Sequence, residues 1–571
     1  MKKLTSLVLA TLIITAGFFY LGAGSNSDSE TVSVRSGQLI GLVNNVTATV
    51  SYRGIPYAAA PVGDRRWMPP APAETWADVR KAFEHGPACV QPRAGELGFI
   101  SLMMDGAGMS SWRKTVVRWF LGFSSPGIFS EDCLTLSIYA PTIASKSLPV
   151  MVWYHGGGHK FGAGDAANYD GSALASRGVI VVSINYRLGI LGFFAHPELT
   201  AESANNSSGN YGTLDQIQAL TWVKDNIAAF GGDPDNVLIF GESAGAHSVG
   251  QIMASPLSRG LIHKAIAQSG IGTHQFTPLR NGGGAWRSAE EQGVEFARAV
   301  GVEGSDQVLR LRVMPAEELV AAFEKHPLLD ALSHPVVDGW VMPKSTAATF
   351  AAGEQAQIPF MIGTNADEGT LLGPLIGSPF VKRSPGPATP EDYESMVRDV
   401  YPDEADAILD YYPVASDDDL FNGINTLLGD HLFGMQAWFS ANETARHGVP
   451  TWLYFFTRTS PAESQWAGAY HGSEIPFVFD SPFPLFPVNE FDSELTDRIV
   501  TYWTNFAKNG NPNQPDMPIW TRFQPIDPQE MELGEKVGMR PVARREKYEA
   551  LMIDQYRELG NDPSVVRSMG L

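Results

Sequence analysis

Ser243 is the strongest candidate for a reactive residue, because it is the central serine of the sequence Gly-Glu-Ser-Ala-Gly at positions 241–245. The apolar residues 236–240 before it predict a strand, and residues 246–253 after it predict a helix. A sharp turn between such a strand and helix presents the serine hydroxyl above the edge of a sheet. The flanking glycines lack a Cβ atom, so they allow strand and helix to approach closely. The pattern predicts that Ser243 is a nucleophile.

Attack by a serine on an acyl carbon also requires donors for the developing oxyanion. Residues 148–154 predict a strand, and the sequence His-Gly-Gly-Gly follows it at positions 155–158. Consecutive N–H groups of a glycine run can face one point without obstruction by side chains. We expect the amides of Gly157, Gly158 and Ala244 to form the oxyanion hole, each contributing about 3 kcal/mol to transition-state stabilisation.

The general base is expected to be a histidine beyond the carboxyl end of a strand, where chemistry occurs in open α/β sheets. His431, His447 and His471 lie well beyond the middle of the chain. Residues 450–457 predict a strand; His447 precedes it and His431 lies in a helix-like stretch, whereas His471 follows the strand on a loop. This order favours His471.

The carboxylate that orients the histidine is predicted by the same argument. Residues 359–362 predict a strand, and the loop after it contains Asp367 and Glu368. Spacing alone does not separate these two carboxylates. The one that does not orient the histidine is expected to cap the loop or a helix.

Many ordered motifs resemble those of the type-B carboxylesterase family, which comprises carboxylesterases, cholinesterases and bile-salt-type lipases. The similarity extends from about residue 38 to residue 523. Its motifs are at positions 53–58, 61–63, 130–134, 185–189, 209–212, 222, 230–234, 241–245, 268–270, 335–339, 367–369 and 471–476.

The resemblance implies an α/β-hydrolase fold, with a mostly parallel central sheet, helices on both faces and capping insertions. It selects Glu368 as the triad acid and supports Ser243 and His471. It also implies a disulfide between the only two cysteines, Cys89 and Cys133. These expectations agree with the alternation of strand-like and helical stretches along the chain.

Arg66 and Glu131 match a structural salt bridge of the family. Ser269 and Glu474 match positions behind the triad, where they are expected to support it. His159 departs from the family pattern, and Glu242 is expected either to tune the site electrostatically or to form a structural ion pair.

The implied activity is hydrolysis of a small-molecule carboxylic ester through an acyl-enzyme, without a cofactor or metal. The tryptophan-asparagine-proline pattern of cholinesterases is absent, which disfavours choline esters. A lipase or a specialised detoxifying esterase is an alternative within the family. A non-catalytic adhesion protein on the same fold is a third hypothesis, which the presence of all three triad residues disfavours.

Residues 1–24 resemble a signal peptide, because two lysines precede an uncharged stretch at 7–21 and small residues at 22–24. An uncleaved anchor is the alternative. We expect a secreted or periplasmic protein and, if the segment is removed, no stable membrane association. The net charge of −21 disfavours binding to nucleic acid or to anionic membranes.

Residues 25–571 are expected to form a single catalytic domain with insertions around 282–324 and 384–420. At the end of the chain, residues 543–559 predict a packed terminal helix, because Tyr548, Leu551, Met552, Tyr556 and Leu559 recur at helical spacing. The oligomeric state is not defined by the sequence.

Overall fold

The computed structural model describes residues 29–124, 128–142, 147–274, 277–280, 287–376, 387–482 and 485–560. The predicted signal segment, residues 1–24, and part of each predicted insertion lie outside the described residues. Within the described ranges, no helix is long and apolar enough to cross a membrane.

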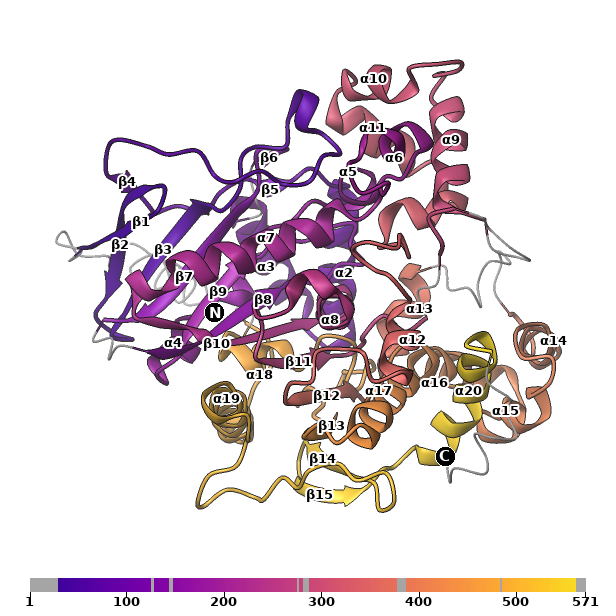
Figure 1. The fold of residues 1–571 in the computed structure, drawn as a ribbon. Coiled ribbons are helices and arrows are strands. Elements are labelled where there is room, and N and C mark those ends of the chain that lie inside the picture. The colour runs from indigo at the N-terminus through magenta and orange to yellow at the C-terminus, as the bar shows by residue number, and fades with distance from the viewer. Residues whose placement is uncertain are drawn as a thin grey trace, which may run out of the picture.

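A mixed sheet of 13 strands forms the centre of the described structure (Figure 1). The strands of the chain are β1 Ser29–Val34, β2 Gly37–Asn44, β3 Thr49–Pro56, β4 Arg80–Lys81, β5 Ala88–Cys89, β6 Phe129–Ser130, β7 Thr135–Pro141, β8 Leu148–Tyr154, β9 Ile180–Ile184, β10 Gly232–Glu242, β11 Lys264–Gln268, β12 Phe360–Asn365, β13 Thr451–Phe456, β14 Gln529–Leu533 and β15 Val537–Pro541. The short strands β5 and β6 form a separate pair.

The main path of the sheet runs β1-β2-β3-β7-β9-β8-β10-β11-β12-β13-β14-β15. Every pair from β9 to β14 along this path is parallel. Antiparallel pairs extend the sheet at both ends. The predicted mostly parallel sheet is therefore present, and the carboxyl ends of β8, β10, β12 and β13 meet at one edge because parallel strands point the same way.

Helices cover both faces of this sheet. The α-helices are α2 Arg93–Gly106, α3 Ser111–Ser124, α4 Ser172–Ser176, α5 Gly189–Phe193, α6 Pro197–Glu202, α7 Tyr211–Asn226, α8 Ala244–Ala254, α9 Ala289–Ala299, α10 Gln307–Arg312, α11 Ala316–Phe323, α12 Thr346–Ala351, α13 Gly369–Ile376, α14 Pro390–Val400, α15 Ala405–Tyr411, α16 Leu420–Gly429, α17 Met435–Arg446, α18 Ile475–Phe479, α19 Glu490–Asn509 and α20 Arg545–Glu558. A π-helical turn, η8 Asp430–Gly434, joins α16 to α17, and the 3-10 turn η5 covers Pro327–Ser333.

Two apolar cores lie on opposite faces of the sheet, as the strand period of two residues requires. In β8, Val150 and Val152 belong to the core beneath α7 and α8, whereas Met151 and Trp153 belong to the core beneath α18 and α19. Figure 1 shows α7 and α8 on one side of the strands and α18 and α19 on the other. All four of these β8 side chains are fully buried.

The elements predicted at the site are all present, although β10 begins four residues before its predicted start and β12 ends three residues after its predicted end. Strand β8 has the predicted bounds, and β13 differs by one residue at each end. The terminal helix α20 buries Tyr548, Leu551, Met552 and Tyr556, as its spacing predicts. In the described parts of the two insertions, α9–α11 and α14–α15 are helical, and Figure 1 shows them beyond the ends of the strands.

Candidate active site

Ser243 occupies the turn between β10 and α8, at φ 56° and ψ −123°. Positive φ is strained for a residue with a side chain, and the neighbouring glycines make room for the turn. A Cβ atom on Gly245 would collide with the carbonyl oxygen of Tyr154, and one on Gly241 would lie 2.7 Å from the same atom. The close contact of β10, α8 and the end of β8 therefore requires both glycines, and it leaves Ser243 partly accessible to solvent.

The glycine run after β8 lies against this turn. A Cβ atom on Gly156 would be 3.2 Å from Cβ of Ser243. Gly157 and Gly158 adopt positive φ values of 97° and 62°. Within the described parts of the chain, no recorded hydrogen bond uses the N–H groups of Gly157, Gly158 or Ala244, and Ala244 is the first residue of α8. These donors are available to an anion, and the positive end of the helix dipole favours one there.

His471 and Glu368 form the shortest polar link of the site. Nδ1 of His471 donates to Oε2 of Glu368 over 2.6 Å, and both side chains are buried. The other carboxylate oxygen of Glu368 accepts the backbone N–H of Asn365 over 2.7 Å. The ring of Phe433 stacks on the imidazole, with ring centroids 4.5 Å apart. These contacts fix the orientation of the imidazole and direct its Nε2 atom away from Glu368.

Asp367 has a different partner. Its carboxylate accepts the backbone N–H of Ala469 over 2.8 Å, and its own N–H donates to the carbonyl oxygen of Ala469 over 2.9 Å. Asp367 also pairs with Tyr470 as an isolated β-bridge. Asp367 thus joins the loop after β12 to the loop that holds His471, while Glu368 contacts the imidazole itself.

The link between Ser243 and His471 is not made in this structure. Among the residues that the structure describes, Nε2 of His471 has no hydrogen-bond partner, and it lies 3.2 Å from Oε1 of Glu242. Glu242 is buried and immediately precedes Ser243. Catalytic hydrogen bonds in unliganded enzymes are often long or poorly aligned and tighten only with substrate. The structure therefore brings Ser243, Glu368 and His471 to one edge of the sheet with one of the two relay contacts formed.

The electrostatics of the site are those of a buried carboxylate–imidazole cluster. Burial lowers the pKa of His471, but the charges of Glu242 and Glu368 outweigh burial, so this pKa is raised above its usual value. Burial raises the pKa of Glu242, against the attraction of His471. Because Glu242 and His471 are in contact, they titrate as a pair. Protonation of Glu242 removes one of the charges that holds the proton on His471.

A buried polar network lies behind the triad. Glu474 accepts hydrogen bonds from Asn365 Nδ2 over 2.6 Å and from Gln268 Nε2 over 3.1 Å. Trp503 Nε1 donates to Gln268 Oε1 over 3.1 Å. Glu474 was expected behind the triad from the family resemblance. The sequence analysis did not identify Asn365, Gln268 or Trp503 as members of this network. Gln268 and Asn365 are the last residues of β11 and β12, and this position is the only signal that the sequence gives for them. Trp503, in α19, gives no such signal.

Ser269 is also behind the triad, directly after β11, with φ 54° and a buried hydroxyl that has no hydrogen-bond partner in the described part of the chain. His159 is fully buried below the glycine turn. Its Nε2 donates to Oγ of Ser248 over 3.2 Å, because that hydroxyl already donates to Ala244 O and accepts from Gln216. His159 is therefore part of the packing under the oxyanion loop.

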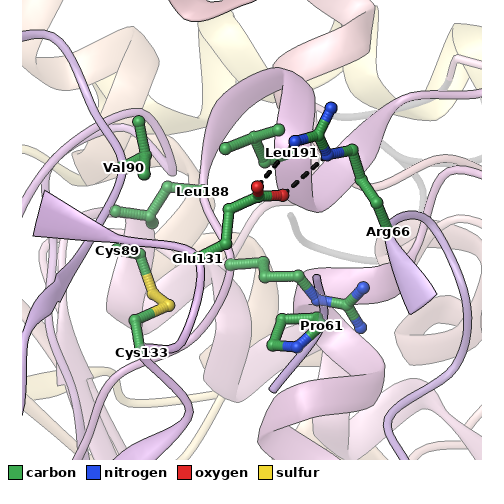
Figure 2. Close-up of a pocket in the computed structure, with 9 residues that line it drawn as sticks. Pro61, Arg66, Cys89, Val90, Glu131, Cys133, Leu188 and Leu191 are labelled. Atoms are coloured by element: carbon green, nitrogen blue, oxygen red, sulfur yellow. Dashed lines mark hydrogen bonds and ion pairs between the residues drawn. A yellow bond between two sulfur atoms is a disulfide. The ribbon is translucent and has the colours of Figure 1, made fainter. Parts of the chain in front are cut away.

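The predicted disulfide and salt bridge lie together (Figure 2). Cys89 and Cys133 are bonded, and Arg66 makes two hydrogen bonds with Glu131, at 2.7 and 2.6 Å. The pocket between them has a volume of about 10 Å³, room for about one water molecule. Its role is structural. Among the described residues, no group of three or more His, Cys, Asp or Glu side chains could hold a metal ion.

Comparison with known proteins decides the family. The family model for the carboxylesterase family matches residues 28–551. The chain belongs to the carboxylesterase family. Among its relatives, the fumonisin B1 esterase of Sphingopyxis macrogoltabida is 35% identical over 536 residues, which cover 91% of this chain and 89% of that protein. Carboxylesterase 1F of Mus musculus is 32% identical over 550 residues, with 90% and 92% covered.

Solved carboxylesterase structures share the fold. A PNB esterase superimposes with a TM-score of 0.72 at 31% identity, covering 91% of this chain and 99% of that one. A carboxylesterase of Geobacillus stearothermophilus gives a TM-score of 0.71 at 31% identity, covering 90% and 99%. This carboxylesterase-family chain thus has the α/β-hydrolase fold, and it is a carboxylic ester hydrolase whose substrates are small-molecule esters.

Proposed function

We propose that the chain is a serine carboxylesterase that hydrolyses its substrate through an acyl-enzyme at Ser243. His471 is the general base and acid, and Glu368 orients it. The observation that supports this proposal most strongly is the 2.6 Å hydrogen bond between His471 Nδ1 and Glu368, formed beside a serine in a strained strand–helix turn. That bond fixes the tautomer in which Nε2 carries the lone pair that a base requires.

In the first half-reaction, Oγ of Ser243 attacks the ester carbonyl carbon as Nε2 of His471 removes the hydroxyl proton. The negative charge moves to the carbonyl oxygen, which accepts hydrogen bonds from the amides of Gly157, Gly158 and Ala244. His471 then donates the proton to the leaving alcohol as the carbon–oxygen bond breaks. In the second half-reaction, water attacks the acyl-enzyme with His471 again as base, and the acid leaves.

Glu242 assists by its protonation state. For His471 to accept the serine proton it has to be neutral at the start of the cycle. Burial favours the protonated form of Glu242, and this form does not hold a proton on His471 by charge. We expect the imidazole to exchange its contact with Glu242 Oε1 for a hydrogen bond with Ser243 Oγ when an ester binds.

Loss of the hydroxyl tests the proposal. Ser243→Ala should abolish hydrolysis of a chromogenic short-chain ester while the far-ultraviolet circular dichroism spectrum stays unchanged. Ser176→Ala, on α4 at the protein surface, is the matched control and should keep wild-type activity. Wild-type activity in purified Ser243→Ala would refute the nucleophile assignment.

A specialised detoxifying esterase is a second candidate, favoured by the similarity to a fumonisin B1 esterase over 91% of this chain. Release of acid from fumonisin B1 by the wild-type protein, and its loss in Ser243→Ala, would support this candidate. Hydrolysis of simple esters without any action on fumonisin B1 would remove it.

We further propose that residues 25–571 act as one catalytic domain outside the cytoplasm. The disulfide between Cys89 and Cys133 is compatible with an oxidising compartment. Cell fractionation, with mass measurement of the mature N-terminus, tests both export and cleavage after residue 24. Recovery of the full-length chain in the cytoplasm would contradict this proposal.

A further inference from the structure

Five histidines that the hydrolytic mechanism does not use lie together on the nucleophile side of the sheet. We call them the histidine cluster: His159, His247, His274, His334 and His431. They come from five separate places, which are the glycine loop after β8, helix α8, the loop after β11, the end of η5 and the π-helical turn η8.

The rings of four members of the histidine cluster form a connected set. His247 lies at the centre, with its ring centroid 5.3 Å from that of His274 and 6.3 Å from that of His159. The ring of His159 in turn lies 5.8 Å from that of His334. His431 is close enough to His274 to interact with it electrostatically.

His247 connects the histidine cluster to the reaction centre. It follows Ser243 by one helical turn, and its N–H donates to the carbonyl oxygen of Ser243 over 2.9 Å. His247 is therefore linked to the residue that carries the nucleophile by a backbone hydrogen bond in the first turn of α8. A Cβ atom on Gly270 would lie 2.7 Å from the His247 ring and 3.5 Å from that same carbonyl oxygen, so Gly270 leaves the space that this ring fills.

Four members of the histidine cluster reach solvent, and we call the space between their rings the recess. His247, His274, His334 and His431 are all partly accessible to solvent. Nevertheless, loss of hydration is the largest cause of the lowered pKa of His247, and it lowers the pKa values of His274 and His431 to about 4.

Two histidines of the recess, His274 and His247, each have a ring nitrogen that can form a further hydrogen bond. Oε1 of Gln436 accepts the backbone N–H groups of Gly272 and Thr273, so its Nε2 is a donor toward Nδ1 of His274. The ring proton of His274 is therefore on Nε2, which is not used in this bond. Nε2 of His247 is buried and has no hydrogen-bond partner among the described residues. A buried polar atom without a partner is costly, unless a ligand supplies the partner.

We propose that the histidine cluster binds a free carboxylate on the ester substrate, so that the preferred substrates are esters bearing an additional carboxylic acid group. The inference rests on the proposed esterase function and specifies its substrate class. A carboxylate offers only acceptors, which match N–H donors from several directions. Neutral imidazoles provide such donors without the strong hydration of a lysine ammonium.

Charge favours the same ligand. The groups that lower the pKa of His247 by charge are other histidines, His471 included. A bound carboxylate favours the protonated form of a nearby ring, because opposite charges attract. Binding is therefore accompanied by proton uptake, and the preference for carboxylate esters strengthens as the pH falls.

Matched pairs of esters test the proposal. One pair places the carboxylate on the acyl side: p-nitrophenyl hydrogen glutarate against p-nitrophenyl 5-methylhexanoate, in which an isopropyl group replaces the carboxylate. The other pair places it on the alcohol side: the butyrate ester of γ-hydroxybutyrate against isohexyl butyrate. In at least one pair, kcat/KM for the carboxylate ester should exceed that for its neutral isostere by about tenfold or more.

Variants of the recess sharpen the test. His274→Gln and, separately, His334→Asn should lower the carboxylate-to-neutral ratio by about tenfold, the effect of one hydrogen bond to a charged group. A change in the reactivity of His471 would affect kcat/KM for both esters equally, because both use the same base. The carboxylate-to-neutral ratio of kcat/KM is therefore insensitive to such a change. His447→Gln, which is outside the recess at the end of α17, is the matched control and should leave the ratio unchanged. Circular dichroism and thermal unfolding establish that each variant is folded.

The outcomes separate this inference from the proposed function. Hydrolysis of the neutral esters with no preference for the carboxylate esters in either pair would overturn the inference alone. An unchanged ratio in both recess variants would also overturn it. Failure to hydrolyse all four esters would contradict the esterase assignment instead.

A binding measurement decides the role of the histidine cluster without catalysis. Isothermal titration of glutarate into Ser243→Ala, in buffers of different ionisation enthalpy at pH 6.5, should show binding with net proton uptake. Adding His274→Gln should weaken that binding by about tenfold. Absence of binding to Ser243→Ala, or binding without proton uptake, would contradict the proposal.

Discussion

His471 and Glu368 are 103 positions apart in the chain, yet the imidazole of one donates a 2.6 Å hydrogen bond to the carboxylate of the other. The contact arises because β12 and β13 are adjacent parallel strands, so the loops after them leave the sheet side by side. The bridge between Asp367 and Tyr470 then holds the two loops together. Neighbouring acids, Asp367 and Glu368, thus have different tasks.

This division of tasks predicts that Glu368→Gln lowers kcat by about 10⁴-fold, because an amide in place of the carboxylate favours the wrong imidazole tautomer. Asp367→Asn, the matched control, keeps the Glu368–His471 contact and should lower kcat by less than about tenfold. Steady-state kinetics of the two variants on one chromogenic ester measure the difference. Similar losses in both variants would contradict the assignment of the acid.

The contact between Glu242 and His471 predicts a change in the pH profile. The Glu242 charge raises the pKa of His471, and only neutral His471 accepts the serine proton. Removing the charge in Glu242→Gln lowers that pKa, so activity should persist to lower pH and the acidic limb of kcat/KM should shift downward. Glu354→Gln, on the surface, is the control. An acidic limb that stays in place or moves to higher pH would rule out this electrostatic role.

The buried ion pair of Arg187 and Asp215 predicts a large effect on stability. Arg187 makes two side-chain hydrogen bonds with Asp215, at 2.8 and 2.7 Å, and their side chains are 4% and 0% exposed. Asp215→Leu or Arg187→Met should each lower the free energy of unfolding by about 3–5 kcal/mol, because the remaining charge is buried without its partner. The double variant should lose less than the sum of the two. Additive losses in urea unfolding would show that the pair is not coupled.

The disulfide predicts a separate effect on stability. The cysteines are 44 positions apart, and the loop between them contains α2 and α3. Cys89→Ala combined with Cys133→Ala should lower the free energy of unfolding by about 4 kcal/mol, through greater freedom of the unfolded chain. Met103 and Ala107 of this loop pack with Tyr470, next to His471. Denaturant unfolding with and without reductant is the measurement, and equal stability in both conditions would contradict the prediction.

Much of the fold could be predicted because hydrophobic patterns in the sequence indicate the strands and helices. Much of the reaction centre could be predicted because strand direction determines which loops meet at one edge of the sheet. The apolar run of β8 has the predicted bounds, and His471 was distinguished from His447 by its position after β13. The choice between Asp367 and Glu368 was different. Both follow β12, so spacing could not separate them, and the family resemblance made the choice that the hydrogen bond to His471 now supports.

The parts that escaped prediction depend on residues that meet only in three dimensions. Glu242 could have tuned the site or formed a structural ion pair, and only the fold places it 3.2 Å from Nε2 of His471. The histidine cluster joins five loops and helices, none of which has a distinctive spacing. His159 gave one signal, a departure from the family pattern after the glycine run, but its burial under that run could not be deduced from its position.

The acyl-enzyme is the central claim, and trapping it is the most direct test. Wild-type protein mixed with excess p-nitrophenyl ester, quenched in acid within the first turnover and digested, should contain the acyl group on the peptide that includes Ser243. The stoichiometry should approach about one acyl group per chain when deacylation is slower than acylation. A p-nitrophenol burst with the acyl group on any other residue, or turnover with no covalent adduct at any quench time, would contradict the account.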